Sequence, residues 1–487
     1  MNKVISWLTI PRLIVTILFI TVFTMAVRVP ADTDTWWHLR SGQYIVETGS
    51  IFTADPFSHT KLGQPWFYPK LGQVLWYGLF ALAGWIGLSL GLTVLVTVAF
   101  GLVWLITPGN IYIRAFAIIL GGITSALIWA ARPQMFSFVL AALVLVLLER
   151  YKRTGSRWIY LLPIITALWG NLHGGYAVAF MLAAVYLIGE IGNRLTRQSD
   201  APTLSWRQIG LLGGVTALSL LTVALNPYGW QMWVYPLRTV GIDVLRDFIQ
   251  EWRSPNFHTT MTWPFAAMLV LTLIIMGATS RLVDWTDVLM VGLWLAASLL
   301  AVRNVGLYGL LTVPILARYG DAALAGYLPP TAGKRPPIFA YLNWLLLGLV
   351  TLAALVRVGL MLPSLSEAKL TENLPARAVQ FIQERTPPGP LFNSYNWGGY
   401  LIFKLWPQYS VYIDGRTDLY DDAFIRRYLD VMAANEGWQQ TLADDGINLV
   451  LIETNSTLAR FLRRDLAWRE VYRDDMAAIF VRQVVSP

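Results

Sequence analysis

Eleven runs of apolar residues divide most of this chain, and they constrain its fold more than any other feature. The runs lie at 11–29, 86–107, 112–131, 134–149, 157–170, 175–193, 207–226, 262–279, 285–302, 304–320 and 338–362. A helix needs about 20 apolar residues to cross the hydrocarbon core of a bilayer, and several of these runs are of that length. Of the 487 residues, 56% are hydrophobic and only 14% are charged, which is outside the range of soluble domains of this size. The sequence therefore predicts a polytopic α-helical membrane protein with about 11 spans, in a range of about 11 to 13.

The composition also excludes several classes of site and partner. The chain has no cysteine, so disulfides, thiolate metal sites and cysteine nucleophiles are all excluded. The formal net charge is +8, but most basic residues lie in short loops between apolar runs, where they set topology and meet anionic lipid. We therefore expect a membrane and no nucleic acid as partner. Lys3 and Arg12 precede the first apolar run and no small-residue cleavage site follows it, so we expect an uncleaved signal anchor.

The distribution of basic residues predicts the orientation of the spans. Residues 66–84 could form a further span or a helix in the membrane interface. If this stretch does not cross and the N-terminus is cytoplasmic, the main basic loops all fall inside the cell. These loops are Arg114, 150–157, 194–207, Arg281 and 318–335. The positive-inside rule therefore favours eleven spans, with 66–84 lying in or re-entering the outer interface of the plasma (inner) membrane.

On this topology, six polar segments lie on the extracytoplasmic side. They are 30–85, 132–133, 171–175, 226–260, 303–304 and everything after 363. The side chains that could carry out a reaction collect in these segments rather than in the inner loops. The sequence therefore predicts an active site on the outer face of a transmembrane domain that covers residues 1–362.

The composition changes after Leu362, and residues 366–487 are typical of a small extracytoplasmic α/β domain. Helices are expected at 375–385, 397–406, 421–434, 437–444 and 456–464, and strands at 390–394, 409–413 and 447–452. A closing hairpin should turn at Asp474-Asp475.

The first outer segment is the richest in reactive side chains. It contains Asp32, Asp34, Asp55, His38, His59 and the pair Trp36-Trp37. A helix is predicted over 35–47, with Thr33 or Asp34 as its N-cap and Gly49 as its end. If this helix lies flat on the bilayer, it holds carboxylates just above the headgroups.

Three motifs in this segment follow one another in a recognisable order. Asp34 and Gly49 are 15 residues apart, Gly63-Gln-Pro65 follows, and Tyr68-Pro69-Lys70-Leu71 comes last. This order resembles the GT-C glycosyltransferases, most closely the branch of the protein O-mannosyltransferases and the aminoarabinose transferases that act on lipid A. The resemblance covers about residues 12–110, and the succession of spans extends it to 362. The chain is also similar to uncharacterised bacterial membrane proteins that share the motif WWHL.

The resemblance implies a reaction and a site. GT-C enzymes transfer a sugar from a polyprenyl-phosphate carrier to an acceptor outside the cytoplasm, here a lipid, a glycan or a protein. It implies an inverting reaction with Asp34 as base and polyprenyl phosphate as leaving group. The chain departs from the branch at two positions, with Thr35 where a Glu is usual and Lys70 where a second Pro is usual. Two alternatives stay open: a lipid-glycan transporter or flippase, and a non-catalytic relative that binds a glycolipid. A transporter would have ionisable residues deep in its spans, whereas the acids here are expected at one surface.

The carboxylates of the first outer segment suit this chemistry for reasons that are independent of the family. Glycosyl transfer needs a base to take the acceptor proton and a setting that tolerates positive charge on the sugar. Asp34 could do both, or it could simply cap its helix. Asp32 is a catalytic candidate for support or for metal binding. Asp55 is a further catalytic candidate, or a turn residue, since it stands before Pro56 at a common turn position. No cofactor is certain; a divalent metal could join Asp32 and Asp34, but the sequence positions no third acidic ligand.

Further candidates would bind the substrate. His38 lies one helical turn from Asp34 and could orient it or contact phosphate. Lys70 is a candidate because of its position in the last motif. His173 lies in Asn171-Leu-His-Gly-Gly175, which is either a site where backbone N–H groups meet an oxyanion or a tight turn between helices.

Arginines at the outer face could neutralise the leaving phosphate. Arg132 and Arg303 each lie between two apolar runs, where they could contact phosphate or extend toward the interface. Glu251 and Arg253 could act in the same site or form a surface ion pair. In the C-terminal domain, Asp414 and Arg416 follow a predicted strand at its carboxyl end, where they could bind the acceptor or dock the domain onto the membrane site.

Overall fold

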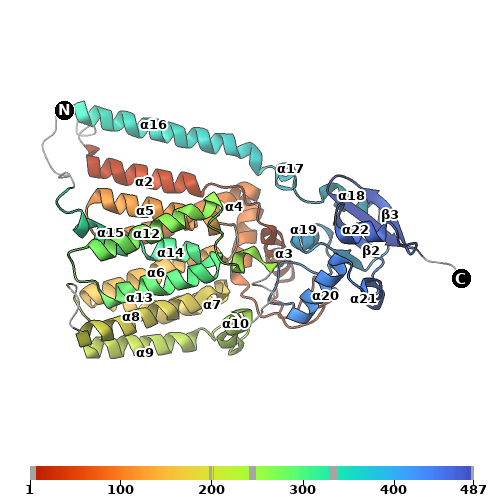
Figure 1. Cartoon of the computed structure of the whole chain (residues 1–487), viewed down its shortest axis with the longest axis horizontal. Helices are drawn as coiled ribbons and strands as arrows, with labels where there is room; N and C mark the ends of the chain where they lie inside the picture. Colours follow the sequence, from red (N-terminus) through yellow and green to blue (C-terminus); the bar gives the residue numbers. More distant parts are fainter. Residues whose placement is uncertain (1–6, 197–199, 201, 241–247, 328–337, 484–487) are drawn as a thin grey trace.

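The computed structural model describes residues 7–196, 200, 202–240, 248–327 and 338–483. Lys3 and parts of the basic loops 194–207 and 318–335 lie outside these ranges. Each predicted apolar run is occupied by helix. The helices are α2 (Ile10–Ala26), the second half of α4 (Leu71–Ile106), α5 (Ile111–Ser125), α6 (Gln134–Thr154), α7 (Leu162–Leu172), α8 (Ala177–Thr196), α9 (Trp206–Thr222), α12 (Trp263–Ala278), α13 (Trp285–Leu300), α14 (Val305–Leu311) with α15 (Val313–Ala323), and α16 (Ile338–Met361). They lie side by side in one bundle, with the C-terminal part at one end (Figure 1).

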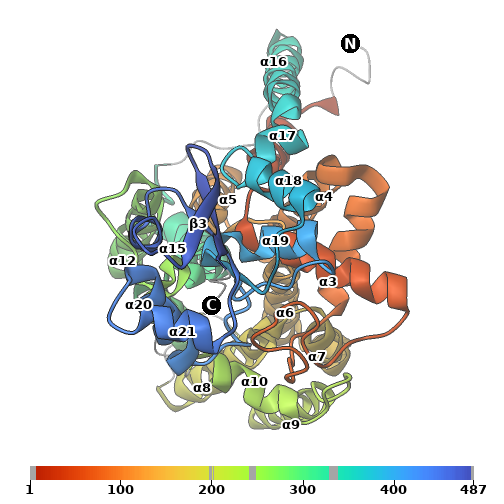
Figure 2. The same cartoon turned by 90° about the vertical axis from the view of Figure 1, so that its right-hand side faces the viewer.

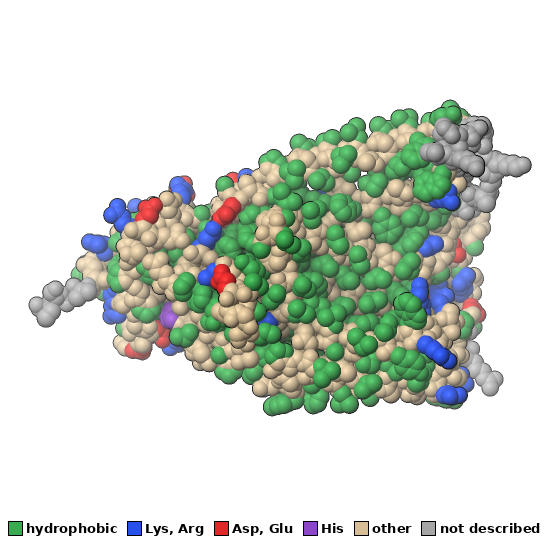
Figure 3. Space-filling view, turned by 180° about the vertical axis from the view of Figure 1, so that it is seen from behind, with side chains coloured by type: hydrophobic (Ala, Val, Ile, Leu, Met, Phe, Trp, Pro, Cys, Tyr) green, Lys and Arg blue, Asp and Glu red, His purple; other side chains and the backbone are tan. Residues whose placement is uncertain are grey.

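The bundle has the surface of an integral membrane protein. Within the described ranges, six helical stretches are long and apolar enough to cross a membrane, and α2 and α13 are shorter apolar helices. Hydrophobic side chains cover the flank of the bundle (Figure 3). Lys and Arg gather along the bundle end that faces away from the C-terminal part, and the C-terminal part carries charges of both signs (Figure 3).

Helix α4 is bent sharply rather than continuous. Ala83 and Gly84 have non-helical backbone angles, and Gly84 has φ +55°, which favours glycine. A Cβ atom on Gly87 would lie 2.3 Å from the carbonyl oxygen of Leu79, so the two halves fold back closely on each other. The stretch 71–82 is therefore not a straight continuation of the span, and whether it crosses the membrane stays a prediction.

The predicted helix of the first outer segment is α3 (Thr33–Thr48), and its cap differs from the expectation. Asp32 is the N-cap, with its Oδ1 accepting a 2.9 Å hydrogen bond from the Asp34 N–H, while Gly49 ends the helix at φ +65°. Asp32, Thr33 and Asp34 are all good capping residues, and the first of them in the sequence, Asp32, forms the cap. Asp34 therefore belongs to the first turn and its carboxylate is available for other contacts.

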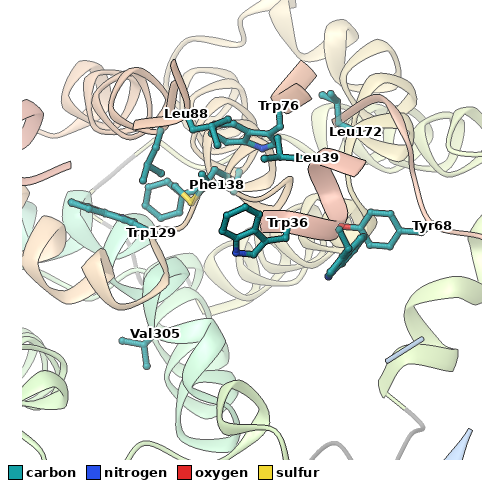
Figure 4. Close-up of a cluster of buried hydrophobic side chains, with 14 of the residues drawn as sticks. Trp36, Leu39, Tyr68, Trp76, Leu88, Trp129, Phe138, Leu172 and Val305 are labelled. Atoms are coloured by element: carbon teal, nitrogen blue, oxygen red, sulfur yellow. The ribbon is translucent and has the colours of Figure 1, made fainter. Parts of the chain in front are cut away.

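Helix α3 is enclosed by protein rather than simply resting on the membrane. The first half of α4 covers one side and α19 (Gly398–Leu405) covers another. Trp36 is buried among Trp85, Tyr400 and Phe403, with ring centroids 4.7, 5.0 and 5.3 Å away. Figure 4 shows Trp36 within a cluster of buried apolar side chains that also includes Trp76 and Phe138. One hydrophobic core thus continues from the bundle into the C-terminal part.

The C-terminal part is a four-stranded sheet with helices around it, close to the prediction (Figure 2). Its elements are α17 (Glu367–Leu370), α18 (Ala376–Arg385), β1 (Leu391–Asn393), α19, α20 (Asp422–Ala433), α21 (Trp438–Asp444), β2 (Leu449–Glu453), α22 (Thr457–Leu462), β3 (Trp468–Arg473) and β4 (Ala477–Arg482). The strand order is β1-β2-β4-β3, with β1 parallel to β2 and the other pairs antiparallel.

The prediction of a strand at 409–413 was wrong. Val411 makes only an isolated bridge, to Ser58 of the first outer segment. Its N–H donates to the Phe57 carbonyl and its carbonyl accepts from the His59 N–H, at 3.1 and 3.0 Å. The backbone of this stretch thus joins the C-terminal part to the first outer segment instead of to the sheet.

A second group of charged side chains corrects the expectation that the acids gather at one surface. Near the ends of α6, α8, α13 and α15 that are predicted to face the cytoplasm, buried acids pair with buried bases. The members are Glu149, Lys152, Glu190, Asp284, Asp287 and Arg318. We call this group the inner ion cluster. Lys152 Nζ lies 2.7 Å from Glu190 and 2.5 Å from Asp284, and Arg318 lies 2.5 Å from Asp287 and also contacts Glu149.

Candidate functional site

A cavity of about 740 Å³ lies where the bundle meets the C-terminal part. Each of the six segments predicted to lie outside contributes to its wall. One residue from each segment is Asp34, Arg132, His173, Glu251, Arg303 and Tyr395. Segments that are distant in the sequence therefore meet at one place, on the side that the loop charges predicted.

Asp34 lies in the wall of this cavity with its carboxylate held from two sides. Trp37, one turn along α3, donates from its Nε1 to Asp34 Oδ1 at 3.0 Å. Arg132 donates from Nη1 to Oδ2 at 2.7 Å. The Asp34 side chain remains 23% exposed. Burial raises its pKa to about 7 and the charges of Asp32 and Glu251 act in the same direction, while Arg132 opposes them. A carboxylate with a pKa near 7 is suited to take and release a proton at neutral pH.

Arg132 is the centre of the charged group in the cavity, which we call the outer ion cluster. Its guanidinium contacts Asp34, Glu251 and, at 3.5 Å, Asp32. Its Nε is buried without a hydrogen-bond partner in the described part of the chain. These contacts lower the pKa of Glu251, whereas burial raises the pKa of Asp32. The cluster thus holds three carboxylates around one guanidinium.

Arg303 lies in the same cavity wall as the outer ion cluster. It packs over the ring of Trp252 at 4.4 Å, and no described carboxylate lies within ion-pair distance of it. Arg303 is half-buried in the cavity wall, and the partial loss of water around its guanidinium lowers its pKa. A partly desolvated arginine without a paired carboxylate favours the binding of an anion in the cavity.

The carboxylates that could hold a metal ion surround the guanidinium of Arg132. Asp32, Asp34 and Glu251 supply three carboxylates, and the guanidinium of Arg132 lies at the point where they meet. Among the described residues, no group of three His, Asp, Glu or Cys side chains has the geometry of a metal site. The donor set of the described residues therefore fits a bound guanidinium and does not fit a resident metal.

Two histidines complete the membrane side of the cavity. His38 is buried, and its Nδ1 lies 3.3 Å from Gln73 Nε2. His173 Nδ1 lies 2.7 Å from Ser137 Oγ and accepts from the Gly175 N–H at 3.0 Å. Burial is the largest cause that lowers the pKa of both, and the pKa of His173 falls to about 3. The Gly175 N–H is bonded to the imidazole, so this N–H does not form the oxyanion site considered from the sequence.

The C-terminal part closes the cavity from the opposite side. A Cβ atom on Gly415 would lie 2.1 Å from Asp34 Oδ1, so only a glycine allows the backbone to come this close to the carboxylate. Gly399 likewise approaches the Thr33 carbonyl, where a Cβ would lie 2.6 Å away. Asp418 also lines the cavity and accepts from Trp66 Nε1 at 3.1 Å and from the Tyr235 hydroxyl at 3.3 Å.

Four predicted site residues lie elsewhere. Asp55 is buried, and its carboxylate accepts from the N–H groups of Phe57 and Ser58 and contacts Arg416, so its oxygens are occupied. Asp414 is bonded to Arg416 at 2.7 Å in the same buried group. The position of these two acids corrects their assignment as base and acceptor ligand.

The other two displaced residues are basic. Lys70 is enclosed by aromatic rings, with Nζ 3.3 Å from the centroid of Trp66, and it does not line this cavity. Arg253 is exposed and does not line the cavity either. Arg416 does line the cavity, but its buried guanidinium binds Asp55 and Asp414 and so docks the C-terminal part onto the first outer segment.

Several cavity residues were not predicted from the sequence. They include Tyr68, Gln134, Tyr235, Tyr395, Asn396 and Glu453. Tyr395 and Asn396 follow β1, and Glu453 ends its parallel neighbour β2, where its carboxylate accepts from Ser394 Oγ at 2.5 Å. Ligands in α/β sheets commonly bind at the carboxyl ends of parallel strands, so the rule applied to Asp414 could have identified this edge.

Comparisons with known proteins agree with the described fold. No protein-family model matches the sequence, and no curated protein matches it. Among solved structures, the arabinofuranosyltransferase AftD from Mycobacteria has a TM-score of 0.54 at 14% identity, over 96% of this chain and 40% of that one. The archaeal oligosaccharyltransferase AglB from Archaeoglobus fulgidus, solved with an inhibitory peptide and a dolichol-phosphate, has a TM-score of 0.51 at 11% identity, over 90% and 69%. ArnT from Cupriavidus metallidurans, bound to undecaprenyl phosphate, has a TM-score of 0.50 at 16% identity, over 96% and 98%.

These likenesses establish the fold. The chain has a GT-C-like fold, which confirms the sequence resemblance, and it spans less than half of the length of AftD but nearly the whole of ArnT. At 11 to 16% identity, these similarities are evidence for the fold of the chain and not for the reaction that it catalyses.

Proposed function

We propose that this chain is an integral membrane glycosyltransferase that transfers a sugar from a polyprenyl-phosphate carrier to an acceptor outside the cytoplasm. The observation that carries the proposal is the position of Asp34 in a cavity with Arg132 and Arg303 at the membrane end of the C-terminal part. Structural neighbours of the same fold include an arabinofuranosyltransferase, an oligosaccharyltransferase solved with a dolichol-phosphate, and a protein bound to undecaprenyl phosphate, which supports this assignment.

The proposed reaction assigns one task to each group. An acceptor hydroxyl or amine attacks the anomeric carbon from the side opposite the phosphate, and the bond from that carbon to the phosphate oxygen breaks. Because the attack comes from the side opposite the leaving phosphate, the sugar is transferred with inversion, and Asp34 takes the proton of the attacking group. Arg132 and Arg303 stabilise the charge that develops on the leaving phosphate. Asp32 and Glu251 hold Arg132 in place.

The family's missing Glu leaves the non-catalytic alternative to be tested. Thr35, at that position, is buried and does not line the cavity; its hydroxyl lies 3.4 Å from the Ala131 carbonyl. The contacts of Asp34 therefore do not depend on residue 35. The transporter alternative gains one observation, because the inner ion cluster puts ionisable groups within the bundle. In that cluster, however, every described base is paired with a described acid, as in a structural network.

The proposed orientation puts the cavity outside the cell. Because the chain has no cysteine, single cysteines at Ser156 and Ser456 report on the two ends of the bundle without background. In intact cells, an impermeant thiol reagent should label the cysteine at 456 and not the one at 156. Labelling at 156 alone would reverse the topology.

The function is tested with the full chain in proteoliposomes. Native mass spectrometry should detect bound undecaprenyl phosphate, and radiolabelled polyprenyl-phosphate hexoses and pentoses, offered as a panel, should lose their sugar to an acceptor or, slowly, to water. A donor that binds and is never cleaved supports the non-catalytic alternative. A lipid-linked sugar that crosses the bilayer intact supports the transporter.

A further inference from the structure

A chain of hydrogen bonds runs from the interior of the bundle to the imidazole of His173. Trp169, fully buried in α7, donates from Nε1 to Ser137 Oγ at 2.6 Å. Ser137, in the first turn of α6, lies 2.7 Å from His173 Nδ1. The Gly175 N–H donates to the same nitrogen at 3.0 Å.

The direction of these bonds determines where the imidazole carries its proton. An indole N–H and a backbone N–H can only donate. The Gly175 N–H donates to His173 Nδ1, so this nitrogen carries no proton. The Ser137 hydroxyl must then donate to Nδ1, while its oxygen accepts from Trp169. Nδ1 accepts both bonds, so the ring is neutral and its proton is on Nε2.

The surroundings keep His173 in this form. Burial and the charges of Arg303 and Arg132 lower its pKa to about 3, so the imidazolium is disfavoured at neutral pH. The approach of the loop requires glycine, because a Cβ atom on Gly175 would lie 2.6 Å from Ser137 Oγ. The second glycine of the His-Gly-Gly pattern is thus explained by the hydrogen bonds that orient the ring, and the first by the close approach of Tyr235, where a Cβ atom would lie 2.3 Å from a ring carbon.

The opposite edge of the ring is available to a ligand. His173 lines the same cavity as Arg132 and Arg303, and its Nδ1 edge is occupied by Ser137 and Gly175. A fixed, neutral N–H beside two guanidinium groups suits an anion, because it adds a donor without adding a third positive charge that would repel the arginines.

We infer that His173 is a neutral Nε2–H donor to a phosphate oxygen of the lipid-linked substrate, and that Ser137 and Trp169 are positioning residues that act through it. The assignment of the ligand rests on the proposed function. The state of the ring does not, so the two parts can be tested separately.

The first test determines the protonation state and tautomer of the His173 imidazole in the absence of a ligand. The chain has only four histidines, so full-length protein labelled with ¹³C and ¹⁵N in histidine alone gives few resonances by magic-angle-spinning NMR in proteoliposomes. His173→Gln identifies the signals of His173 by their loss. We expect a neutral ring at pH 7, with the protonated nitrogen correlated to Cδ2 as Nε2. A ring that is charged, or protonated on Nδ1, overturns the inference.

The second test uses Ser137→Ala, which removes one donor to Nδ1 and leaves Gly175 in place. The His173 signals should move or broaden, while those of exposed His258 stay unchanged. If the His173 signals are unaffected, Ser137 does not position the ring.

The third test adds undecaprenyl phosphate to the labelled protein. The Nε2–H proton of His173 should shift when the lipid binds. His173→Ala should weaken binding by about tenfold, as expected for loss of a hydrogen bond to a charged group, whereas His173→Gln keeps a donor near the Nε2 position and should bind more tightly than the Ala variant. If the lipid binds and neither the resonance nor the affinities change, the inference fails and the proposed function stands. If the lipid does not bind at all, the proposed function fails together with this ligand, and the state of the ring is judged by the first test alone.

Discussion

The chain has an ion cluster at each end of its helix bundle, and the two differ in what surrounds them. In the inner ion cluster, Lys152, Glu190 and Asp284 have side chains that are at most 3% exposed, and each contacts an opposite charge. In the outer ion cluster, Asp34 and Glu251 are 23% and 39% exposed to a cavity. The Nε atoms of Arg132 and Arg318 both lack a partner among the described residues, so exposure to the cavity is what distinguishes the two clusters.

The difference separates a group that supports the fold from a group prepared for a ligand. A sealed cluster in which every charge is paired is closed to a ligand, and its main effect is on stability. An open cluster with carboxylates of raised pKa and a spare arginine can exchange protons and bind an anion. From the sequence alone both are charged residues near helix ends, so the comparison depends on the structure.

The largest expected effect comes from opening the inner ion cluster. Arg318→Met removes the partner of Glu149 and Asp287 and leaves two buried carboxylates without compensation, which should cost about 3 to 5 kcal/mol of stability. Thermal unfolding in detergent should show the loss, while protein that remains folded still binds undecaprenyl phosphate. Arg157→Met, at an exposed arginine of the same end, should change stability by less than about 0.5 kcal/mol. Equal stability of the two variants would contradict the role given to the inner ion cluster.

The second prediction compares Arg303 with Arg253, because the sequence made both of them candidates for the site. Arg303→Met should weaken binding of undecaprenyl phosphate about tenfold to hundredfold, because it removes a partly desolvated guanidinium from the cavity. Arg253→Met, in an exposed position outside the cavity, should bind within about twofold of wild type. Isothermal titration or native mass spectrometry can measure both. The assignment is wrong if Arg253 matters and Arg303 does not.

The third prediction concerns pH. Only ionised Asp34 can accept a proton, and its pKa is raised to about 7, so kcat/KM should fall about tenfold per unit as pH decreases below that value. Glu251 raises this pKa through its charge, so Glu251→Gln should move the acidic limb to lower pH. A rate that is flat from pH 5 to 8, about two units around the expected midpoint, would exclude Asp34 as the titrating base.

The helices and most of the C-terminal elements could be predicted from the sequence because their signals are local. Apolar runs, caps and turn residues act within a few positions, and the eleven runs and α18, α20 and α21 all follow from them. The N-cap of α3 shows the limit of such signals, since Asp32, Thr33 and Asp34 are all competent caps and tertiary contacts decide among them.

The site could be predicted only in part, because its pairings are not local. The positive-inside rule brought six segments to one side, and Asp34, Arg132, His173, Glu251 and Arg303 do line one cavity. No sequence pattern indicates that Arg416 pairs with Asp55, 361 residues away, and that pairing is what removes Asp55 from the site. The same holds for Lys70, whose place among aromatic rings depends on how the first outer segment folds back on itself.

The central claim is that Asp34 is the base of a glycosyl transfer, and Asp34→Asn tests it most directly. Asn keeps the size of Asp and can still accept from Trp37, Arg132 keeps Asp32 and Glu251, and the α3 cap at Asp32 is untouched. The unfolding free energy should therefore change by no more than about 1 kcal/mol. Asp475→Asn, at an exposed acid outside the cavity, is the matched control.

The measurement is the rate of sugar release from the polyprenyl-phosphate donor by wild type and by Asp34→Asn, with stability recorded on the same preparations. The account predicts that the variant is as stable as wild type and releases sugar at least about 100-fold more slowly. A stable Asp34→Asn protein that releases sugar at the wild-type rate would contradict it.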